Sequence, residues 1–189
     1  MAGVRIGVDK LHYAICTDGD AETWDTPVAL KGVINVNINP NTSQETLFAD
    51  DGPYESSATL GQVEVEIGKA QLTLEERGIL LGHTYANGVL TSKSSDVAPY
   101  VAIGFRTLKS NGDYRYVWLY KGRFQDLEDS NETKGDSVNF QTDTLNGQFL
   151  QTHKNGAWKV EVDGDSTEDV TTIIKDWFTK VYEPTTVGG

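Results

Sequence analysis

The sequence predicts a mainly β (α+β) domain with one or two helices, most simply a two-sheet β-sandwich or an open barrel. Runs of alternating apolar and polar residues recur along the chain and are clearest at 32–39, 60–70 and 100–123. This period of two is typical of strands that bury one face. Only 167–182 carries a wide apolar stripe at helical spacing. Strands therefore predominate, and helices are expected to flank the sheets.

Length and composition fit one domain. The 189 residues are enough to bury a core without disulfides or metal. We assign the domain to 1–183, with an N-terminal arm at 1–9 and a flexible tail at 184–189. The formal net charge of −12 argues against stable binding to a nucleic-acid backbone, because affinity for phosphates comes from Lys and Arg.

No membrane partner and no disulfide are expected. No apolar run approaches the length of a membrane span, and the N-terminus lacks the apolar core of a signal peptide. Cys16 is the only cysteine, and its alternation with Ala14 in the predicted strand 10–17 favours a small core residue. Trp24, in the loop that follows, is expected to cover the end of the core.

The strand at 32–39 alternates apolar residues with Asn35, Asn37 and Asn39. This pattern is typical of a half-buried strand whose outer face is polar and uncharged. Pro40 is expected to end the strand.

An extended loop is predicted at 40–60, interrupted by a short strand or arm at 44–49. The strand at 60–70 then alternates valine and isoleucine with Glu64 and Glu66, so both acids are expected to point outward. The residues at the tip of the loop form no recognisable catalytic arrangement. They suggest an arm that needs another molecule to pack against. The tip comprises Asp50, Asp51, Gly52, Pro53, Tyr54 and Glu55.

The segment 100–123 predicts the clearest hairpin, because Asn111-Gly112 is a favoured pair for a two-residue type I′ turn. That turn sets Phe105 opposite Trp118. One face is then expected to combine the apolar residues of the first strand with the aromatic residues of the second. The polar segment before the hairpin, 83–99, is expected to form a long loop.

Further strands follow the hairpin. The segment 137–152 predicts a long strand or hairpin in which Asn139, Gln141 and Asp143 share one face. Another strand is predicted at 157–162, directly after an Asn-Gly turn.

Two helices have recognisable start signals. Thr73 and Glu76 form a capping box, and Gly82 can supply a left-handed C-terminal cap. The second helix is predicted at 167–182, with Ser166 as its cap.

No arrangement of residues in the sequence predicts catalysis. The three histidines lack metal-ligand spacing, and no nucleotide-binding or nucleophile motif is present. The acidic segment 163–168 has its glycine at the wrong position for a calcium loop. Glu64 and Glu66 could imitate a hydrolase pair, but no aromatic residues predict a pocket beside them. We expect no catalytic residue, no metal, no cofactor and no enzymatic activity.

Five separated stretches carry a family resemblance, in the order NPNTSQETLFADDGPYE, LGQVEVEI, LEERGILLGHTYANGVL, VAPYVAIGFRTLKSNGDYRYVWLYKGRF and ETKGDSVNFQT. Together they resemble the major tail proteins of long, non-contractile phage tails. These are the tail tube subunits found in phages and prophages of Gram-positive bacteria. The resemblance covers nearly the whole chain, 4–183.

The resemblance implies a tail-tube β-sandwich with a flanking helix and long arms. It also implies homohexameric rings that stack into a tube, through which DNA passes without specific binding. The implied partners are further copies of the chain, a tape-measure protein, a tail terminator and a distal tail protein. The implied location is the virion, after assembly in the host cytoplasm.

Two candidate assembly sites follow from this resemblance. The tip at 50–55 is the candidate for contact between subunits or stacked rings. The candidate lumen-facing residues are Asn35, Asn37, Asn39, Glu64, Glu66, Asn139, Gln141 and Asp143. An ordinary solvated outer face is an equal alternative for each of these eight. The competing functions are a carbohydrate- or receptor-binding module, based on exposed Trp and Tyr, and a hydrolase based on Glu64 and Glu66.

Overall fold

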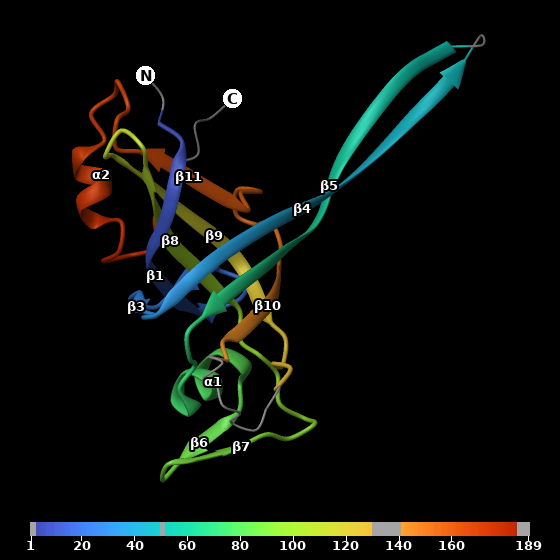
Figure 1. The fold of residues 1–189 in the computed structure, drawn as a ribbon. Helices are drawn as coiled ribbons and strands as arrows, with labels where there is room; N and C mark the ends of the chain where they lie inside the picture. Colours follow the sequence, from blue (N-terminus) through green and yellow to red (C-terminus); the bar gives the residue numbers. More distant parts are fainter. Residues whose placement is uncertain (1–2, 50–51, 130–140, 185–189) are drawn as a thin grey trace, which may run out of the picture.

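The computed structural model describes residues 3–49, 52–129 and 141–184 (Figure 1). The protein is mainly β, with 52% of residues in strands and 9% in helices, as the sequence predicted. One large antiparallel sheet of nine strands forms the body, and a separate two-stranded sheet lies below it. No helix in the described ranges is long and apolar enough to span a membrane.

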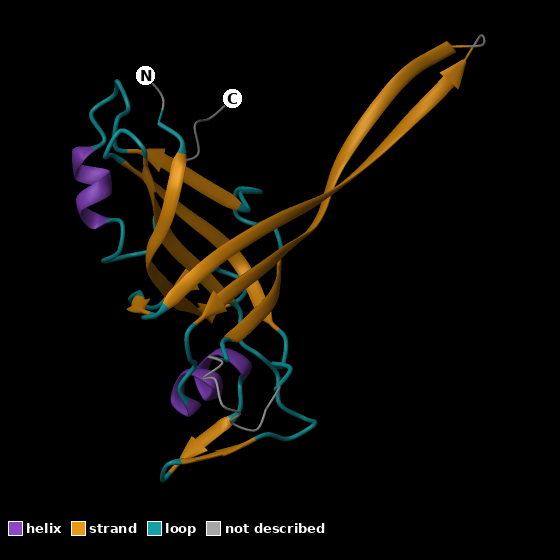
Figure 2. Cartoon of the chain, in the orientation of Figure 1, coloured by secondary structure: helices purple, strands orange, loops and turns teal. Residues whose placement is uncertain are grey.

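The large sheet has the hydrogen-bonded order β2-β1-β8-β9-β10-β5-β4, with β3 beside β1 and β11 beside β9. Figure 2 distinguishes the strands from the helices and loops by colour. Its strands are β1 (Arg5–Asp18), β2 (Thr23–Trp24), β3 (Val28–Ala29), β4 (Val33–Ala49), β5 (Gly52–Lys69), β8 (Val101–Lys109), β9 (Tyr114–Phe124), β10 (Asp143–Phe149) and β11 (Lys159–Asp163). The small sheet contains β6 (Thr84–Ala86) and β7 (Val89–Thr91). The predicted N-terminal arm at 1–9 is part of β1 from Arg5 onward.

The large sheet curls around the main core. Inward side chains of β1, β5, β8, β9 and β10 meet there, with Ile67, Ile103, Leu119 and Phe149 all fully buried. Strand β4 comes close to β1 at the open side of this curl, although the two strands share no ladder. The curled sheet thus buries one face of β8, β9 and β10 and of the proximal half of β5.

Helix α1 (Leu74–Leu81) closes the lower end of this core, and its end signals are confirmed. The Thr73 hydroxyl accepts from the Glu76 N–H (3.2 Å), and the Glu76 carboxylate accepts from the Thr73 N–H (2.8 Å). Gly82 ends the helix in the left-handed conformation, at φ 77°. Leu80 and Leu81 are buried against the sheet.

Helix α2 (Thr171–Asp176) covers the opposite face of β8 and β9. Trp118 and Trp177 form the centre of this second core, and the Trp118 indole N–H donates to the Trp177 carbonyl (3.0 Å). The helix is shorter than the predicted 167–182 and begins after Val170. Polar contacts hold the preceding residues in turns, with the Ser166 hydroxyl accepting from a nearby backbone N–H.

The β8–β9 hairpin exists, but its predicted register is wrong by one residue. Phe105 lies opposite Val117, not Trp118. The turn has three residues, because the Lys109 N–H donates to the Asp113 carbonyl (2.8 Å) while the Gly112 N–H donates to the Lys109 carbonyl (3.0 Å). A shift of one residue moves a side chain to the other face, which is why Tyr116, Trp118 and Tyr120 face α2 and not the main core.

The Asn-Gly pair of a two-residue hairpin occurs elsewhere. Asn87 and Gly88, at φ 53° and 80°, join β6 to β7 inside the segment predicted to be a loop, 83–99. Positive φ at both central positions is the signature of a type I′ turn.

Candidate functional site

A long two-stranded ribbon projects from the body (Figure 1). It is formed by the distal halves of β4 and β5, residues 41–49 and 52–60, which stay paired out to Ala49 and Gly52 with one shift of register between Leu47 and Phe48. The sequence prediction of a loop at 40–60 is therefore wrong, since nearly all of it is strand. Nine residues of antiparallel strand extend about 30 Å, so the ribbon reaches far beyond the core.

Pro40 does not end β4, because β4 is an edge strand. A proline lacks the N–H of a ladder hydrogen bond and is tolerated at edges and bulges. Pro40 pairs with Val63 and Thr42 pairs with Leu60, so a bulge lies between the two positions. The strand therefore bends here and continues into the ribbon.

Beyond Leu60, which packs against the main core, none of the described side chains of the ribbon is buried. Every side chain described at 41–44, 46 and 56–59 is exposed, on both faces. An isolated two-stranded ribbon is at best marginally stable in water. The ribbon therefore has the geometry of an element completed by contact with another molecule. Of the tip residues, Asp50 and Asp51 lie outside the described residues, and 52–55 begin β5.

The hairpin of β4 and β5 carries acidic residues and no Lys, Arg or His between 33 and 68. Its acids are Glu45, Asp50, Asp51, Glu55, Glu64 and Glu66. These six charges equal half of the formal charge of −12. Two such hairpins placed side by side would repel each other at low salt.

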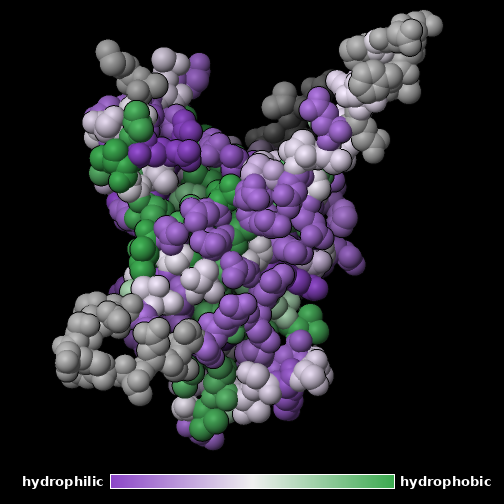
Figure 3. All heavy atoms as spheres, turned by 45° about the vertical axis from the view of Figure 1, so that its right-hand side comes forward, coloured by the Kyte–Doolittle hydropathy of each residue, from purple (hydrophilic) through white to green (hydrophobic). Residues whose placement is uncertain are grey.

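A polar face crosses β4, β5 and β10 at the base of the ribbon. The Asn37 amide donates to Glu66 (3.0 Å), and the Asn39 amide donates to Glu64 (3.3 Å). The cross-strand neighbours on β10 extend both rows. The residues of this polar face are Asn37, Asn39, Glu64, Glu66, Asn146 and Gln148. Figure 3, which turns this side of the body forward, shows a mostly hydrophilic surface beneath the ribbon.

The other predicted lumen residues do not all share this face. The half-buried Asn35 amide lies over Gly68, where an added Cβ would fall 1.9 Å from the amide oxygen. Asp143 belongs to the inward register of β10 and accepts from Arg77 (3.0 Å) and from a backbone N–H near α1. Gln141 is exposed just before β10, and Asn139 lies outside the described residues.

Sequence reasoning missed Asn146 and Gln148. The predicted strand at 137–152 placed its apolar face on even-numbered residues, whereas Leu145 and Phe149 are the buried ones. These two large apolar residues, four apart, were the available signal for the odd-numbered inner face.

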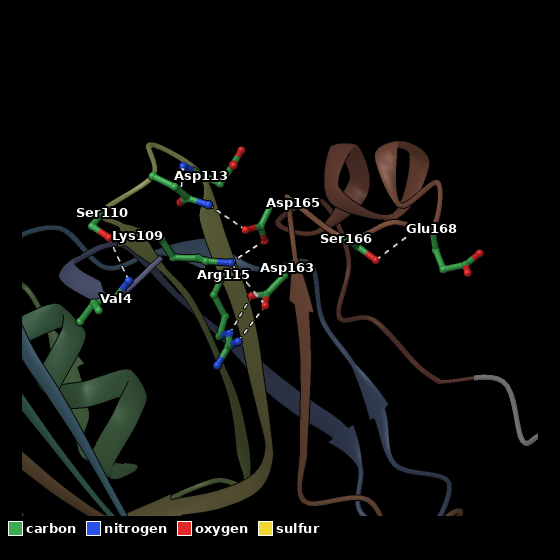
Figure 4. Close-up of polar contacts among 10 residues, drawn as sticks. Val4, Lys109, Ser110, Asp113, Arg115, Asp163, Asp165, Ser166 and Glu168 are labelled. Carbon is green, nitrogen blue, oxygen red and sulfur yellow. Dashed lines mark hydrogen bonds and ion pairs between the residues drawn. The ribbon is translucent and has the colours of Figure 1, made fainter. Parts of the chain in front are cut away.

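The acidic segment 163–168 forms an ion-pair cluster (Figure 4). Asp163 accepts two hydrogen bonds from Arg115, both at 2.7 Å. Asp165 accepts from Lys109 and from the amide of Asn111. The hydrogen bonds from Arg115 lower the pKa of Asp163 despite partial burial. The carboxylates of this segment therefore stabilise the β8–β9 hairpin near its turn. No cluster of side chains in the described ranges has the ligands for a metal ion.

A buried ion pair holds the place where the sheet divides. Lys121 donates to Glu22 (2.6 Å), and the two residues are 5% and 2% exposed. Glu22 also accepts from the N–H groups of His153 (2.8 Å) and Lys154 (3.0 Å). Burial alone would raise the pKa of Glu22, but these hydrogen bonds together lower it. Beside Lys121, the outer edge of β9 changes its partner from β11 to β10.

One groove has aromatic walls. It lies between β2 and the segment that follows α2, has a volume of about 500 Å³, and includes Trp24 and Tyr182, which are partly exposed. The Tyr182 ring stacks on Trp177 with ring centroids 5.4 Å apart. Polar side chains such as Asp25 and Lys180 form its rim.

Comparisons with known proteins identify no relative of this chain. No protein-family model matches the chain, and no curated protein matches it.

Proposed function

We propose that this protein is a structural subunit that self-assembles into stacked hexameric rings and forms the tail tube of a long-tailed phage. The tube is the conduit through which DNA enters the host. The observation that carries the proposal is the ribbon, which extends about 30 Å from the body with its side chains at 41–44, 46 and 56–59 exposed on both faces. A ribbon without a core of its own needs a second molecule to stabilise it.

Charge supports a head-to-tail contact between copies. Ribbons that carry only acids disfavour a contact in which one ribbon lies against another. The ribbon of one copy would then bind a different surface of the next. Contacts between unlike surfaces generate rings or open filaments, which are the two elements of a stacked tube.

The polar face supports a role as channel wall. It presents carboxylates and amides, with Glu64 and Glu66 exposed, so a passing phosphate meets like charge and no strong binding site. One cation, Arg123, borders the polar face, since it pairs with Gln148 in the ladder. Its guanidinium carbon lies over the Tyr100 ring, 3.9 Å from the ring centroid. The curled sheet would then be the tail-tube form of a β-sandwich, located in the virion. Tape-measure, terminator and distal tail proteins would be the further partners.

Shortening the ribbon tests this function. Residues 44–58 are replaced by Asn-Gly, so that Ser43 and Thr59, which pair in the native ladder, flank a short turn. We expect the same thermal midpoint as the full chain, because none of the deleted residues whose side chains the structure describes belongs to either core. Negative-stain microscopy should show tubes or rings for the full chain and dispersed subunits for the shortened one. The matched control Thr59→Ala keeps the ribbon length and should assemble normally.

Two results would contradict the assignment. The shortened chain could form normal tubes, which would exclude the ribbon as the assembly element. Alternatively, the full chain could remain a single subunit at high concentration in the presence of a tape-measure protein, which would exclude self-assembly.

The aromatic groove favours a second candidate, a carbohydrate- or receptor-binding module. Partly exposed Trp and Tyr rings beside carboxylate and ammonium groups provide both stacking surfaces and hydrogen-bond partners. Glycan binding by single subunits, lost on Trp24→Ala while assembly remains normal, would favour this module.

A further inference from the structure

Four Asn-Gly pairs occur in the chain, at Asn87, Asn111, Asn146 and Asn155. Asn-Gly is the dipeptide most prone to deamidation, because glycine has no side chain to shield its backbone nitrogen. That nitrogen attacks the asparagine side-chain carbonyl carbon and forms a five-membered ring. Both groups must be free to approach each other, so the folded structure decides which pair reacts.

In three of the four pairs, hydrogen bonds or sheet pairing restrain the reacting groups. The Asn111 amide donates to Asp165 (2.7 Å) and the following Gly112 N–H donates to a carbonyl (3.0 Å). The Asn155 side-chain oxygen accepts two hydrogen bonds, and the Gly156 N–H donates to the Thr152 carbonyl (2.9 Å).

The third held pair lies in a sheet. Asn146 is inside β10, where Gly147 pairs with β5 on one side and β9 on the other. An added Cβ at Gly147 would meet the Phe124 ring at 2.8 Å. The backbone here cannot rotate without breaking the sheet.

In the fourth pair, both the asparagine side chain and the glycine backbone nitrogen are unrestrained. Asn87 and Gly88 form the exposed tip of the β6–β7 hairpin. Within the described residues, neither the Asn87 amide nor the Gly88 N–H makes a hydrogen bond. No atom lies within 4 Å of the position that a Gly88 Cβ would occupy. Both reacting groups therefore face solvent in a short hairpin, with three residues in each strand, that can open locally at low cost.

We propose that Asn87 is a site of spontaneous deamidation. The Gly88 nitrogen forms a bond to the Asn87 side-chain carbon and loses its proton, and ammonia leaves as the C–N bond of the amide breaks. Water then opens the resulting succinimide at either carbonyl and yields aspartate or isoaspartate. No oxidant, metal or enzyme is required. The product gains a carboxylate, and the isoaspartate form lengthens the backbone of the turn by one carbon atom.

The longer backbone matters for the helix beneath the hairpin. Tyr85 and Leu90, which pair across the hairpin, lie against Gly78 of α1. A two-residue type I′ turn sets their register, so isoaspartate at Asn87 would loosen this contact.

Peptide mapping by mass spectrometry tests the proposal on the full chain. Single subunits are incubated at mildly alkaline pH, and the mass gain from replacing NH₂ by OH is followed at all four asparagines. Asn87 should react at least about tenfold faster than Asn155, because reaction at Asn155 first requires the loss of two or more hydrogen bonds. In denaturant, where every pair is free, the four rates should converge.

Each outcome decides the matter. Equal rates at Asn87 and Asn155 in the folded chain would overturn the proposal. So would a rate ratio that persists unchanged in denaturant, since local sequence and not the fold would then set it. The Asn87→Gln variant should lose the early modification, which excludes misassignment of the peptide.

Discussion

Removing the carboxylate of Glu22 should destabilise the protein more than removing any exposed carboxylate. The Glu22→Gln change leaves the Lys121 ammonium, 5% exposed, without its ionic partner. Breaking one side of a buried ion pair costs about 3–5 kcal/mol. For a chain of this size, that cost corresponds to a fall in Tm of about 6–20 °C.

Two controls separate burial from charge. Glu161→Gln removes a partly exposed carboxylate that lies 3.2 Å from Lys159, and it should change the free energy of unfolding by about 1 kcal/mol or less. The double variant Glu22→Gln with Lys121→Met should recover part of the loss, because no unpaired charge remains buried.

Acid titration supplies an independent check on Glu22. Its pKa is lowered in the folded protein, so its ionised form stabilises the fold above the pKa of the unfolded chain. That contribution is lost as the pH falls through the folded pKa. Denaturant unfolding of the wild type and both controls measures these effects. A Glu22→Gln loss no larger than that of Glu161→Gln would refute the reasoning.

Three further predictions concern the sheet and its charges. Gly122→Ala should cost about 1–3 kcal/mol in chemical denaturation, because its Cβ would fall 2.3 Å from the buried Phe149 ring, whereas Gly7→Ala, with no atom within 4 Å, should be nearly neutral. Asp163→Asn should reduce the loss of stability on acidification. The pKa of Asp163 is lowered in the folded protein, so its ionised form stabilises the fold above the unfolded pKa, and this contribution is lost as the pH falls through the folded pKa. An acid transition unchanged by the substitution would contradict this. Glu64→Lys should preserve Tm, since the side chain is exposed, but tubes assembled from this variant should retain added DNA at low salt. Tubes of the control Glu64→Gln should not retain DNA. Equal retention of DNA by both variants would argue against the role of the polar face as channel wall.

Local signals in the sequence predicted what depends on neighbouring residues. The capping box at Thr73 and the left-handed cap at Gly82 were both placed correctly, because each requires only residue types at fixed spacing. The inward register of Val63 and Val65 followed from alternation alone. These features need no knowledge of the rest of the fold.

Tertiary context decided the features that were missed. Pro40 is tolerated because β4 is an edge strand, a fact that the local sequence does not contain. The β8–β9 register depends on a three-residue turn, Ser110 to Gly112, and the Asn-Gly pair inside it suits a two-residue turn equally well. The short α2 follows from hydrogen bonds that hold Ser166 in a turn.

The free edge of β4 has a consequence for the unassembled chain. In the part that the structure describes, β4 is hydrogen-bonded only to β5 along seventeen residues, and an uncovered edge of this length is a template for aggregation. Pro40 interrupts its row of donors, the bulges distort it, and the acids of the hairpin repel an identical edge. Newly made chains are thereby discouraged from pairing edge to edge before a partner with a different surface is available.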